Sequence, residues 1–375
     1  MHEVAVPDTE RLRERRSMKW SAHDPEVLPL PVAEMDFELA EPIRRALHDA
    51  VSRSDTGYSW PGTELGEALA SFAADRWSWR IDPTAVTAVG DVGVGCVELI
   101  RLLSEPGDAV VVNPPVYAPF FAWIAETGRR VAEAPLTDAY RIDLDALEEA
   151  FSHRPAVYLL CNPHNPVGRV HTAAELSAIV ELADRYDVTV LSDEVHAPLV
   201  LAGAAYTPML TVPGAAERTI ALTAASKSWN LAGLKCAQIV TASPAMRDVT
   251  ARLPAGVGVR VGHFGVIATI AAYDESREWL DDLLNTLGSR RTLLGTLLAE
   301  SLPTVRWTPP DATFLAWLDC RALGAGLLPY ERFLAAGVAT DNGPKFGAQG
   351  DGFVRLNFAT SAEILTEAVR RMASA

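Results

Sequence analysis

The most informative stretch of the chain is residues 223–235, which run Thr223-Ala224-Ala225-Ser226-Lys227-Ser228-Trp229-Asn230-Leu231-Ala232-Gly233-Leu234-Lys235. Lys227 follows a hydroxyl residue at the end of an apolar run, and Lys235 comes just after Gly-Leu. A lysine that is partly shielded from water has a lowered pKa, so its amine is free to form a Schiff base. Taken alone, the stretch does not separate this role from that of a solvated surface lysine, which is the commoner state.

Three further stretches place polar residues after or within apolar strands. The first, Leu160-Cys161-Asn162-Pro163-His164-Asn165-Pro166-Val167-Gly168, predicts a rigid polar loop after a strand. The second, Leu191-Ser192-Asp193-Glu194-Val195-His196, puts an acid at the end of another strand. The third, Gly352-Phe353-Val354-Arg355-Leu356-Asn357-Phe358, puts an arginine inside a late apolar strand.

Composition limits the class of protein. A chain of 375 residues can bury a large core, and we expect one large and one small domain. The net charge of −15 argues against nucleic acid or an anionic membrane as the main partner. The cysteines are widely spaced, which fits a reducing cytoplasm and no structural zinc: Cys96, Cys161, Cys236 and Cys320. The N-terminus has no apolar core, and no apolar run is long enough to span a bilayer, so we expect neither a signal peptide nor a membrane segment.

From residue 84 to about 240, short apolar strands alternate with amphipathic helices. The predicted strands are 85–89, 109–112, 130–134, 156–161, 188–192, 219–223 and 237–241, and the predicted helices are 97–103, 117–127 and 172–186. Such alternation indicates a mostly parallel sheet covered on both faces. Ligands of these sheets bind beyond the carboxyl ends of the strands, where the motifs above lie.

The rest of the chain predicts smaller units. Residues 1–40 form an arm that packs on the body, 41–53 form a helix, and Thr63 caps a helix that runs to residue 77 after the turn-rich loop 56–62. The pattern breaks at 254–265, a long interrupted helix covers 266–301, and strands follow near 305–307, 313–319 and 353–358. We expect an N-terminal arm of residues 1–44 beside the small domain, a large domain of 45–262, and a small α+β domain of 263–375.

In their order and spacing these motifs resemble the fold-type-I pyridoxal-phosphate (PLP) enzymes of the aspartate aminotransferase superfamily. Within it the chain is most similar to the MalY/PatB branch of cystathionine β-lyase-like C–S lyases. The resemblance runs from Met18-Lys19-Trp20 and Val32-Ala33-Glu34-Met35-Asp36-Phe37, a segment that can line the site, to the C-terminus. It implies the fold-type-I α/β fold, a mostly parallel seven-stranded sheet in a large PLP-binding domain, PLP as cofactor, and a homodimer with shared active sites.

The resemblance implies a role for each central residue. Lys227 would hold PLP and take the Cα proton of the substrate. Asp193 would keep the pyridine nitrogen protonated, because a carboxylate beside it favours the charged form, although an isolated Asp there can also be a turn cap. Asn165 and His196 would contact the O3′ side of the ring, and Tyr117 would stack on it. Asn165 can otherwise be a turn residue and Tyr117 a core aromatic.

Phosphate binding needs positive charge and backbone donors at a helix N-terminus. The glycine-rich turn 90–95 offers the amides of Val92 and Gly93, with Ser226 and Lys235 completing the site. Relatives carry a serine where this chain has Ala224, so either Ser226 or Thr223 supplies the hydroxyl. Asp91 departs from the small residue common at its place, and we expect its carboxylate to point away from the phosphate.

Two more residues concern the substrate. Arg355, in an apolar strand, has a planar fork that suits the α-carboxylate of an amino acid, with a structural salt bridge as the alternative. Asn165 would lie beside that substrate. Tyr58 resembles the tyrosine that family members send across the dimer interface to the partner's phosphate, so the resemblance assigns it to cofactor and substrate binding.

The resemblance implies β-elimination on cystathionine or another cysteine S-conjugate. The alternatives are an aminotransferase, which the same motifs would serve, and a pathway enzyme for a larger cysteine conjugate with a pocket changed by residues 254–263. A regulatory protein that borrowed the fold is disfavoured by the acidic charge and by the retention of Lys227.

Overall fold

A seven-stranded sheet lies at the centre of the computed structural model, which describes residues 3–60, 62–324 and 326–375. One strand, β8, runs antiparallel to its two neighbours, and the others are parallel. The strands follow one another in the order β2 (Val86–Val89), β8 (Ala237–Val240), β7 (Thr219–Thr223), β6 (Thr189–Asp193), β5 (Val157–Cys161), β3 (Ala109–Val112) and β4 (Arg130–Glu133). The predicted mostly parallel sheet of seven strands is confirmed, and each strand lies within one residue of its predicted range.

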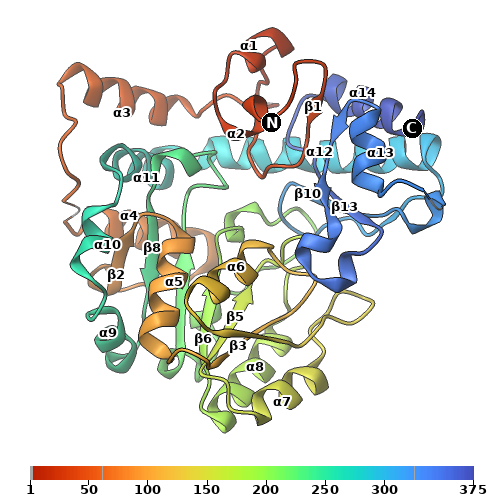
Figure 1. Ribbon diagram of the computed structural model, residues 1–375. Helices are drawn as coiled ribbons and strands as arrows, with labels where there is room; N and C mark the ends of the chain where they lie inside the picture. The colour runs from red at the N-terminus through yellow and green to blue at the C-terminus, as the bar shows by residue number, and fades with distance from the viewer. Residues whose placement is uncertain (1–2, 61, 325) are drawn as a thin grey trace.

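Helices cover both faces of this sheet, which occupies the lower half of Figure 1. Successive side chains of a strand point to opposite faces, so β3 serves two apolar clusters. Val110 and Val112 pack with α5 (Val92–Leu103) and α6 (Pro119–Glu126), whereas Val111 packs with α7 (Leu144–Ser152) and α8 (Ala173–Tyr186). Burial on both faces explains why the strands are apolar throughout.

Both ends of the chain build the upper part of the molecule, where the two termini are marked in Figure 1. The long helix α12 (Arg277–Ser301) crosses it and packs on α14 (Ala362–Ala373). β1 (Leu28–Pro29) pairs in parallel with β11 (Val338–Ala339), which ties the N-terminal segment to the C-terminal part. The other elements here are α1 (Thr9–Arg13), α2 (Met18–Ser21), α13 (Pro329–Ala335) and an antiparallel sheet in the order β12 (Asp341–Asn342), β13 (Phe353–Asn357), β10 (Leu315–Asp319), β9 (Arg306–Trp307).

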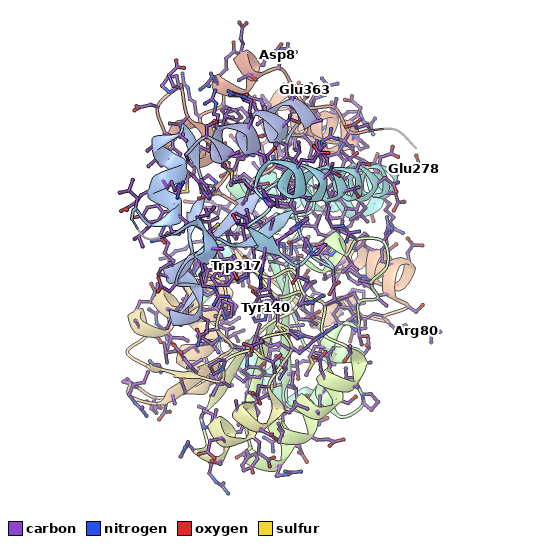
Figure 2. The ribbon with its side chains drawn as sticks, turned by 90° about the vertical axis from the view of Figure 1, so that its right-hand side faces the viewer. Asp8, Arg80, Tyr140, Glu278, Trp317 and Glu363 are labelled. Carbon is purple, nitrogen blue, oxygen red and sulfur yellow. The ribbon has the colours of Figure 1, made fainter. Side chains whose placement is uncertain are left out.

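An apolar contact fixes the small sheet against the large one. Trp317 on β10 stacks on Phe353 with ring centroids 5.2 Å apart, and both belong to the cluster that contains Val111. Figure 2 shows Trp317 beside Tyr140, which packs on the same cluster from the loop after β4. The contact also holds β13, the strand that carries Arg355, at a set position over the large sheet.

Three helices connect the large sheet with the upper part of the molecule. α11 (His263–Glu275) packs against α3 (Glu41–Ser52) and α4 (Glu64–Trp77). A Cβ at Gly262 would lie 2.0 Å from the carbonyl oxygen of Leu234, and one at Gly265 would lie 2.3 Å from it. The glycines near the start of α11 therefore allow this helix to sit directly on the loop after Lys227. The division of the chain at residues 44 and 262 stays a prediction.

The structure differs from the sequence reading at several helices. The helix expected at 97–103 begins five residues earlier, because Asp91 caps it at Val92. Thr63 takes the N-cap position of α4 but does not cap the backbone; its hydroxyl donates to Glu67 Oε1 at 2.7 Å instead. The segment 266–301 is two helices separated at Ser276. Elements that were not predicted are α1, α2, α7, α9 (Pro244–Thr250), α10 (Ala255–Val259), α13, α14, β1, β11 and β12.

Within the turn-rich loop 56–62, Pro61 lies outside the described residues. Across the described part of the chain, no helix combines the length and the apolar character that crossing a bilayer requires.

Candidate active site

A cavity of about 510 Å³ opens at the carboxyl edge of the large sheet. Parallel strands β3, β5, β6 and β7 end there, and α5 begins there, so the loops after them converge. Nine of the residues predicted for the site line this cavity: Val92, Gly93, Tyr117, Asn165, Asp193, His196, Ser226, Lys227 and Lys235. Arg355 lines an adjoining cavity of about 700 Å³, which shares Lys227 and Tyr117 with the first.

Lys227 is held close to the N-terminal segment. Its Nζ donates a hydrogen bond to the carbonyl oxygen of Ala33 at 3.2 Å. Burial and the nearby Arg355 guanidinium together lower the pKa of Lys227 to about 8, against the opposing charges of Glu34 and Asp193. About a tenth of this amine is therefore uncharged at pH 7, and the uncharged form is the one that a nucleophile or base requires.

Asp193 and His196 sit at the end of β6 and just beyond it. Burial raises the pKa of Asp193 to about 6, although the amide of Val195, which donates to Oδ1 at 3.1 Å, and the charge of Lys227 oppose the rise. Burial also lowers the pKa of His196 to about 3, so its ring is neutral. Among the described residues, His196 Nδ1 has no hydrogen-bond partner although it is buried.

Tyr117 forms part of the wall between the two cavities. Its ring packs edge-on against Phe120 and Trp123, with centroids 5.7 Å apart in each pair. Burial and the charge of Asp193 raise the pKa of the Tyr117 hydroxyl to about 12, so this group stays protonated. Tyr117 packs with the apolar core and also faces the cavity, and its stacking on the cofactor ring stays a prediction.

Both terminal nitrogens of Arg355 have hydrogen-bond partners, whereas its buried Nε has none among the described residues. Nη1 donates to Asn165 Oδ1 at 3.1 Å, and Nη2 donates to the carbonyl oxygen of Pro31 at 2.8 Å and to Asp341 Oδ2 at 2.9 Å. The guanidinium also lies 4.8 Å from the ring centre of Phe346. A structural ion pair is thus present, and it orients the fork toward the cavity that Lys227 also lines.

The start of α5 faces the opposite side of the first cavity. Val92 and Gly93 occupy the first two helical positions, so their amides cannot donate within the helix. A Cβ at Gly93 would lie 2.6 Å from the Trp123 ring, which explains the glycine. Ser226 lines the cavity, whereas Thr223 is buried at the end of β7 and is not among the lining residues.

The expectation that Asp91 points away was wrong. Its Oδ1 accepts from the amide of Val94 at 2.8 Å, and its Oδ2 accepts from Lys235 Nζ at 3.0 Å. Because Asp91 is the N-cap of α5, its side chain is turned toward the cavity, and Lys235 is the cation that it meets there.

Pro31, Val32 and Ala33 of the N-terminal segment line the two cavities, which bears out the first part of the predicted stretch 32–37. Asn230 accepts from the amide of Met35 at 2.8 Å and donates to its carbonyl oxygen at 2.9 Å. Asn357 Nδ2 donates to the carbonyl oxygens of Val32 and Glu34 at 2.7 and 2.6 Å. These contacts fix the carbonyl of Ala33 that holds Lys227.

Tyr58 lies apart from both cavities. It is 88% exposed, and its neighbour Trp60 is 91% exposed, in the loop between α3 and α4. Within one chain, the structure does not bring Tyr58 to the site.

Several residues of the site were missed. Trp123, Cys161, Arg260, Asp341 and Lys345 line the cavities. The run Phe120-Phe121-Ala122-Trp123 after Tyr117 was a usable signal for Trp123, and Arg260 falls in the segment 254–263 that broke the pattern. Nothing local to the sequence marked Asp341, because its place follows from pairing β12 with β13.

An α/β chain with a buried lysine, a carboxylate and an arginine around the carboxyl edge of its sheet has the form of a fold-type-I enzyme. Residues 25–372 match the family described as aminotransferase class I and II, and the chain belongs to that family. A Mycobacterium tuberculosis (strain CDC 1551 / Oshkosh) protein named "Putative cystathionine beta-lyase" is 50% identical, over 97% of this chain and 95% of that protein.

Two further comparisons define the branch. Cystathionine beta-lyase PatB of Bacillus subtilis (strain 168) is 34% identical, over 93% of this chain and 92% of that protein. A crystal structure from Corynebacterium diphtheriae, titled a "putative plp-dependent beta-cystathionase", has a TM-score of 0.95 and 38% identity, with 99% of this chain and 98% of that chain covered. The predicted resemblance to fold type I and to the MalY/PatB branch is confirmed.

Proposed function

We propose that this chain is a PLP-dependent C–S β-lyase that acts on cystathionine or another cysteine S-conjugate. Each turnover takes one conjugate and one water and gives a thiol, pyruvate and ammonium. The observation that carries the proposal is that Lys227, Tyr117 and Arg355 meet in one cavity, in a chain 50% identical to a relative named as a cystathionine β-lyase.

The residues present fit PLP. The buried Nδ1 of His196 lacks a hydrogen-bond partner among the described residues. The Lys227 amine donates to a backbone carbonyl and to no described side chain of this site. A phosphate would fit the other side of the same cavity, where it would meet the helix-terminal amides of Val92 and Gly93 together with the side chains of Ser226 and Lys235. The residues proposed to hold PLP are Val92, Gly93, Tyr117, Asn165, Asp193, His196, Ser226, Lys227 and Lys235.

When bound, PLP supplies the electron sink that weakens the Cα–H bond of an amino acid. Lys227 takes the Cα proton, because its lowered pKa leaves part of the amine uncharged. Asp193 would keep a proton on the pyridine nitrogen of bound PLP. This role requires an ionised carboxylate, and a pKa of about 6 leaves Asp193 mostly ionised at neutral pH. Arg355 binds the substrate α-carboxylate beside Asn165, and Tyr117 covers the ring face.

We also propose a cytoplasmic homodimer with shared active sites. Tyr58 and Trp60 are exposed at 88% and 91%, which is unusual for large aromatic side chains and fits a loop that another subunit covers. Tyr58 would reach the phosphate region of the partner site. The free cysteines fit a reducing compartment: Cys96, Cys161, Cys236 and Cys320. Light scattering of the purified protein at the mass of one chain would contradict the dimer.

The deciding experiment supplies cystathionine without any keto acid. A thiolate on Cβ is a good leaving group, so elimination regenerates the starting enzyme without a second substrate. We expect sustained, stoichiometric release of thiol, pyruvate and ammonium over many turnovers. The second candidate is an aminotransferase, which the family itself favours. That enzyme would stall after one turnover and restart when a keto acid is added, and such a stall would overturn the lyase proposal.

A further inference from the structure

The second cavity extends the site beyond the groups that the proposed chemistry uses. Its volume is about 700 Å³, and it shares Lys227 and Tyr117 with the first cavity. Asp341 and Lys345 of the C-terminal part also line it, next to Arg355. A substituent on the sulfur of a substrate held by Arg355 would therefore meet these two charged side chains.

One carboxylate links the two cations of this cavity. Asp341 Oδ2 accepts from Arg355 Nη2 at 2.9 Å, and Asp341 Oδ1 lies 3.1 Å from Lys345 Nζ. Arg355 is 5% exposed, Asp341 18% and Lys345 61%, so Lys345 is the member of the group that a ligand reaches most easily. The group carries one more positive charge than negative, which balances one substrate carboxylate, and the exposed Lys345 amine is the cation that still faces the cavity.

The backbone fixes Lys345 at this place. Asp341 pairs with Arg355 between β12 and β13, and the single-turn helix η7 (Gly343–Phe346) follows directly. A Cβ at Gly343 would lie 2.1 Å from the carbonyl oxygen of Gly350, so the turn is closely packed. Phe346 is 1% exposed and lies under the Arg355 guanidinium. Lys345 is thus anchored by a buried neighbour while its amine stays accessible.

Lysine is rare in this chain. Only four of the 33 lysine and arginine residues are lysines: Lys19, Lys227, Lys235 and Lys345. Each of them lines a cavity at or beside the site, and five arginines line the same cavities: Arg15, Arg16, Arg101, Arg260 and Arg355. A compact, flexible amine at 345 suits a carboxylate whose position varies with the length of the substrate, better than a planar guanidinium does.

We infer that Lys345 recognises a second carboxylate, carried on the sulfur substituent of the substrate. The inference rests on the proposed function and names its substrate class: cysteine S-conjugates whose substituent ends in a carboxylate. Arg355 takes the α-carboxylate, and Asp341 bridges Arg355 and Lys345 through its two carboxylate oxygens. Val32, Tyr330 and Leu334 of the same cavity offer apolar contact to the methylene groups between the two ends. Cystathionine belongs to this class.

The test compares two substrates of nearly equal shape, S-(2-carboxyethyl)-L-cysteine and S-(2-carbamoylethyl)-L-cysteine. Thiol release by the holoenzyme gives kcat/KM for each, and the ratio of acid to amide is the readout. We expect a ratio of about ten in the unmodified enzyme, as for a partly exposed charge-assisted hydrogen bond. Lys345→Met should bring the ratio to about one, and Lys345→Glu should bring it below one through repulsion.

Arg321→Met is the matched control. Arg321 is 65% exposed and pairs with Asp319, which is 18% exposed, so its setting copies that of Lys345 and Asp341 outside the two cavities. This variant should keep the ratio of the unmodified enzyme. A ratio near one in the unmodified enzyme, or a ratio that Lys345→Met and Lys345→Glu leave unchanged, would overturn the inference while the lyase stands. Absence of thiol release from both compounds and from cystathionine would overturn the proposed function and the substrate class with it.

Discussion

Lys19 and Asp36 form a completely buried ion pair, with Lys19 Nζ 2.8 Å from Asp36 Oδ2 and exposures of 1% and 0%. Trp20 Nε1 donates to the other oxygen of the same carboxylate at 2.7 Å. The pair joins the two N-terminal stretches of the sequence that carried the family resemblance, and Lys19 Nζ also donates to the carbonyl oxygen of Glu34. It therefore fixes the segment whose Ala33 carbonyl holds Lys227.

Removing one partner of this pair should destabilise the protein strongly. Asp36→Asn leaves the Lys19 charge buried without a counter-charge, which costs about 3–5 kcal/mol of unfolding free energy. Urea unfolding followed by tryptophan fluorescence measures the loss. The exposed pair Arg44–Glu41, at 62% and 60%, supplies the control, because Arg44→Met should cost less than about 1 kcal/mol. Equal losses from the two changes would show that the Lys19–Asp36 pair has no special structural role.

The pH at which PLP enters the apoenzyme should follow the pKa of Lys227. Only the uncharged amine bonds to the cofactor aldehyde, so the incorporation rate rises with pH through the lysine pKa. We expect a midpoint near 8, whereas a solvated lysine would give one near 10.5. Absorbance during reconstitution with excess PLP measures this rate at each pH, and Lys227→Ala should show no covalent incorporation after borohydride reduction.

The charge of Asp193 allows the direction of a shift in that midpoint to be predicted. The Asp193 carboxylate raises the pKa of Lys227, so Asp193→Asn should move the midpoint to lower pH. A midpoint that stays near 10.5 in the unmodified protein, or covalent PLP at its own site in Lys227→Ala, would remove Lys227 from the proposed role.

Arg355→Ala should weaken the enzyme toward amino acids while PLP remains bound. The guanidinium faces the substrate cavity and not the helix-terminal end where we place the phosphate. Loss of a charge-assisted contact typically costs a few kcal/mol, so kcat/KM for cystathionine should fall about 100-fold or more. The visible spectrum of the holoenzyme should be nearly unchanged. Loss of PLP in equal measure would assign Arg355 a purely structural role.

Local patterns predicted the large sheet well. Strands 109–112 and 219–223 match the structure residue for residue, since an apolar run of four or five residues between turns has few other ways to fold. The residues at the ends of these strands also lie together as expected, because parallel strands bring their carboxyl ends to one edge.

Contacts between segments that lie far apart in the chain could not be predicted from the sequence. β1 and β12 are two residues long and exist only because β11 and β13 lie beside them. The partnership of Arg355 with Asp341 and Pro31 likewise depends on how the chain ends meet. The direction of Asp91 also depends on its neighbours: helix capping and Lys235 turn its carboxylate toward the cavity, whereas the sequence shows only the repulsion that a phosphate would exert.

The geometry of Asp91 leads to a last prediction, which concerns cofactor affinity. The Asp91 carboxylate accepts a hydrogen bond from Lys235 and lies at the start of α5, where we place the cofactor phosphate. A like charge beside a phosphate dianion weakens binding, and the lysine must divide its attraction between two anions. Asp91→Ser removes the charge but keeps a side-chain oxygen that can cap the helix.

We therefore expect Asp91→Ser to bind pyridoxamine 5′-phosphate more tightly than the unmodified apoenzyme does, by about three- to tenfold. This ligand cannot bond to Lys227, so the equilibrium Kd, measured by fluorescence quenching, reports the phosphate site and not covalent capture. Asp91→Ala, which lacks the cap, should gain less because α5 loses about 1 kcal/mol of capping. Weaker binding by Asp91→Ser, with unfolding unchanged, would instead mean that Asp91 holds Lys235 in the position from which it binds the phosphate.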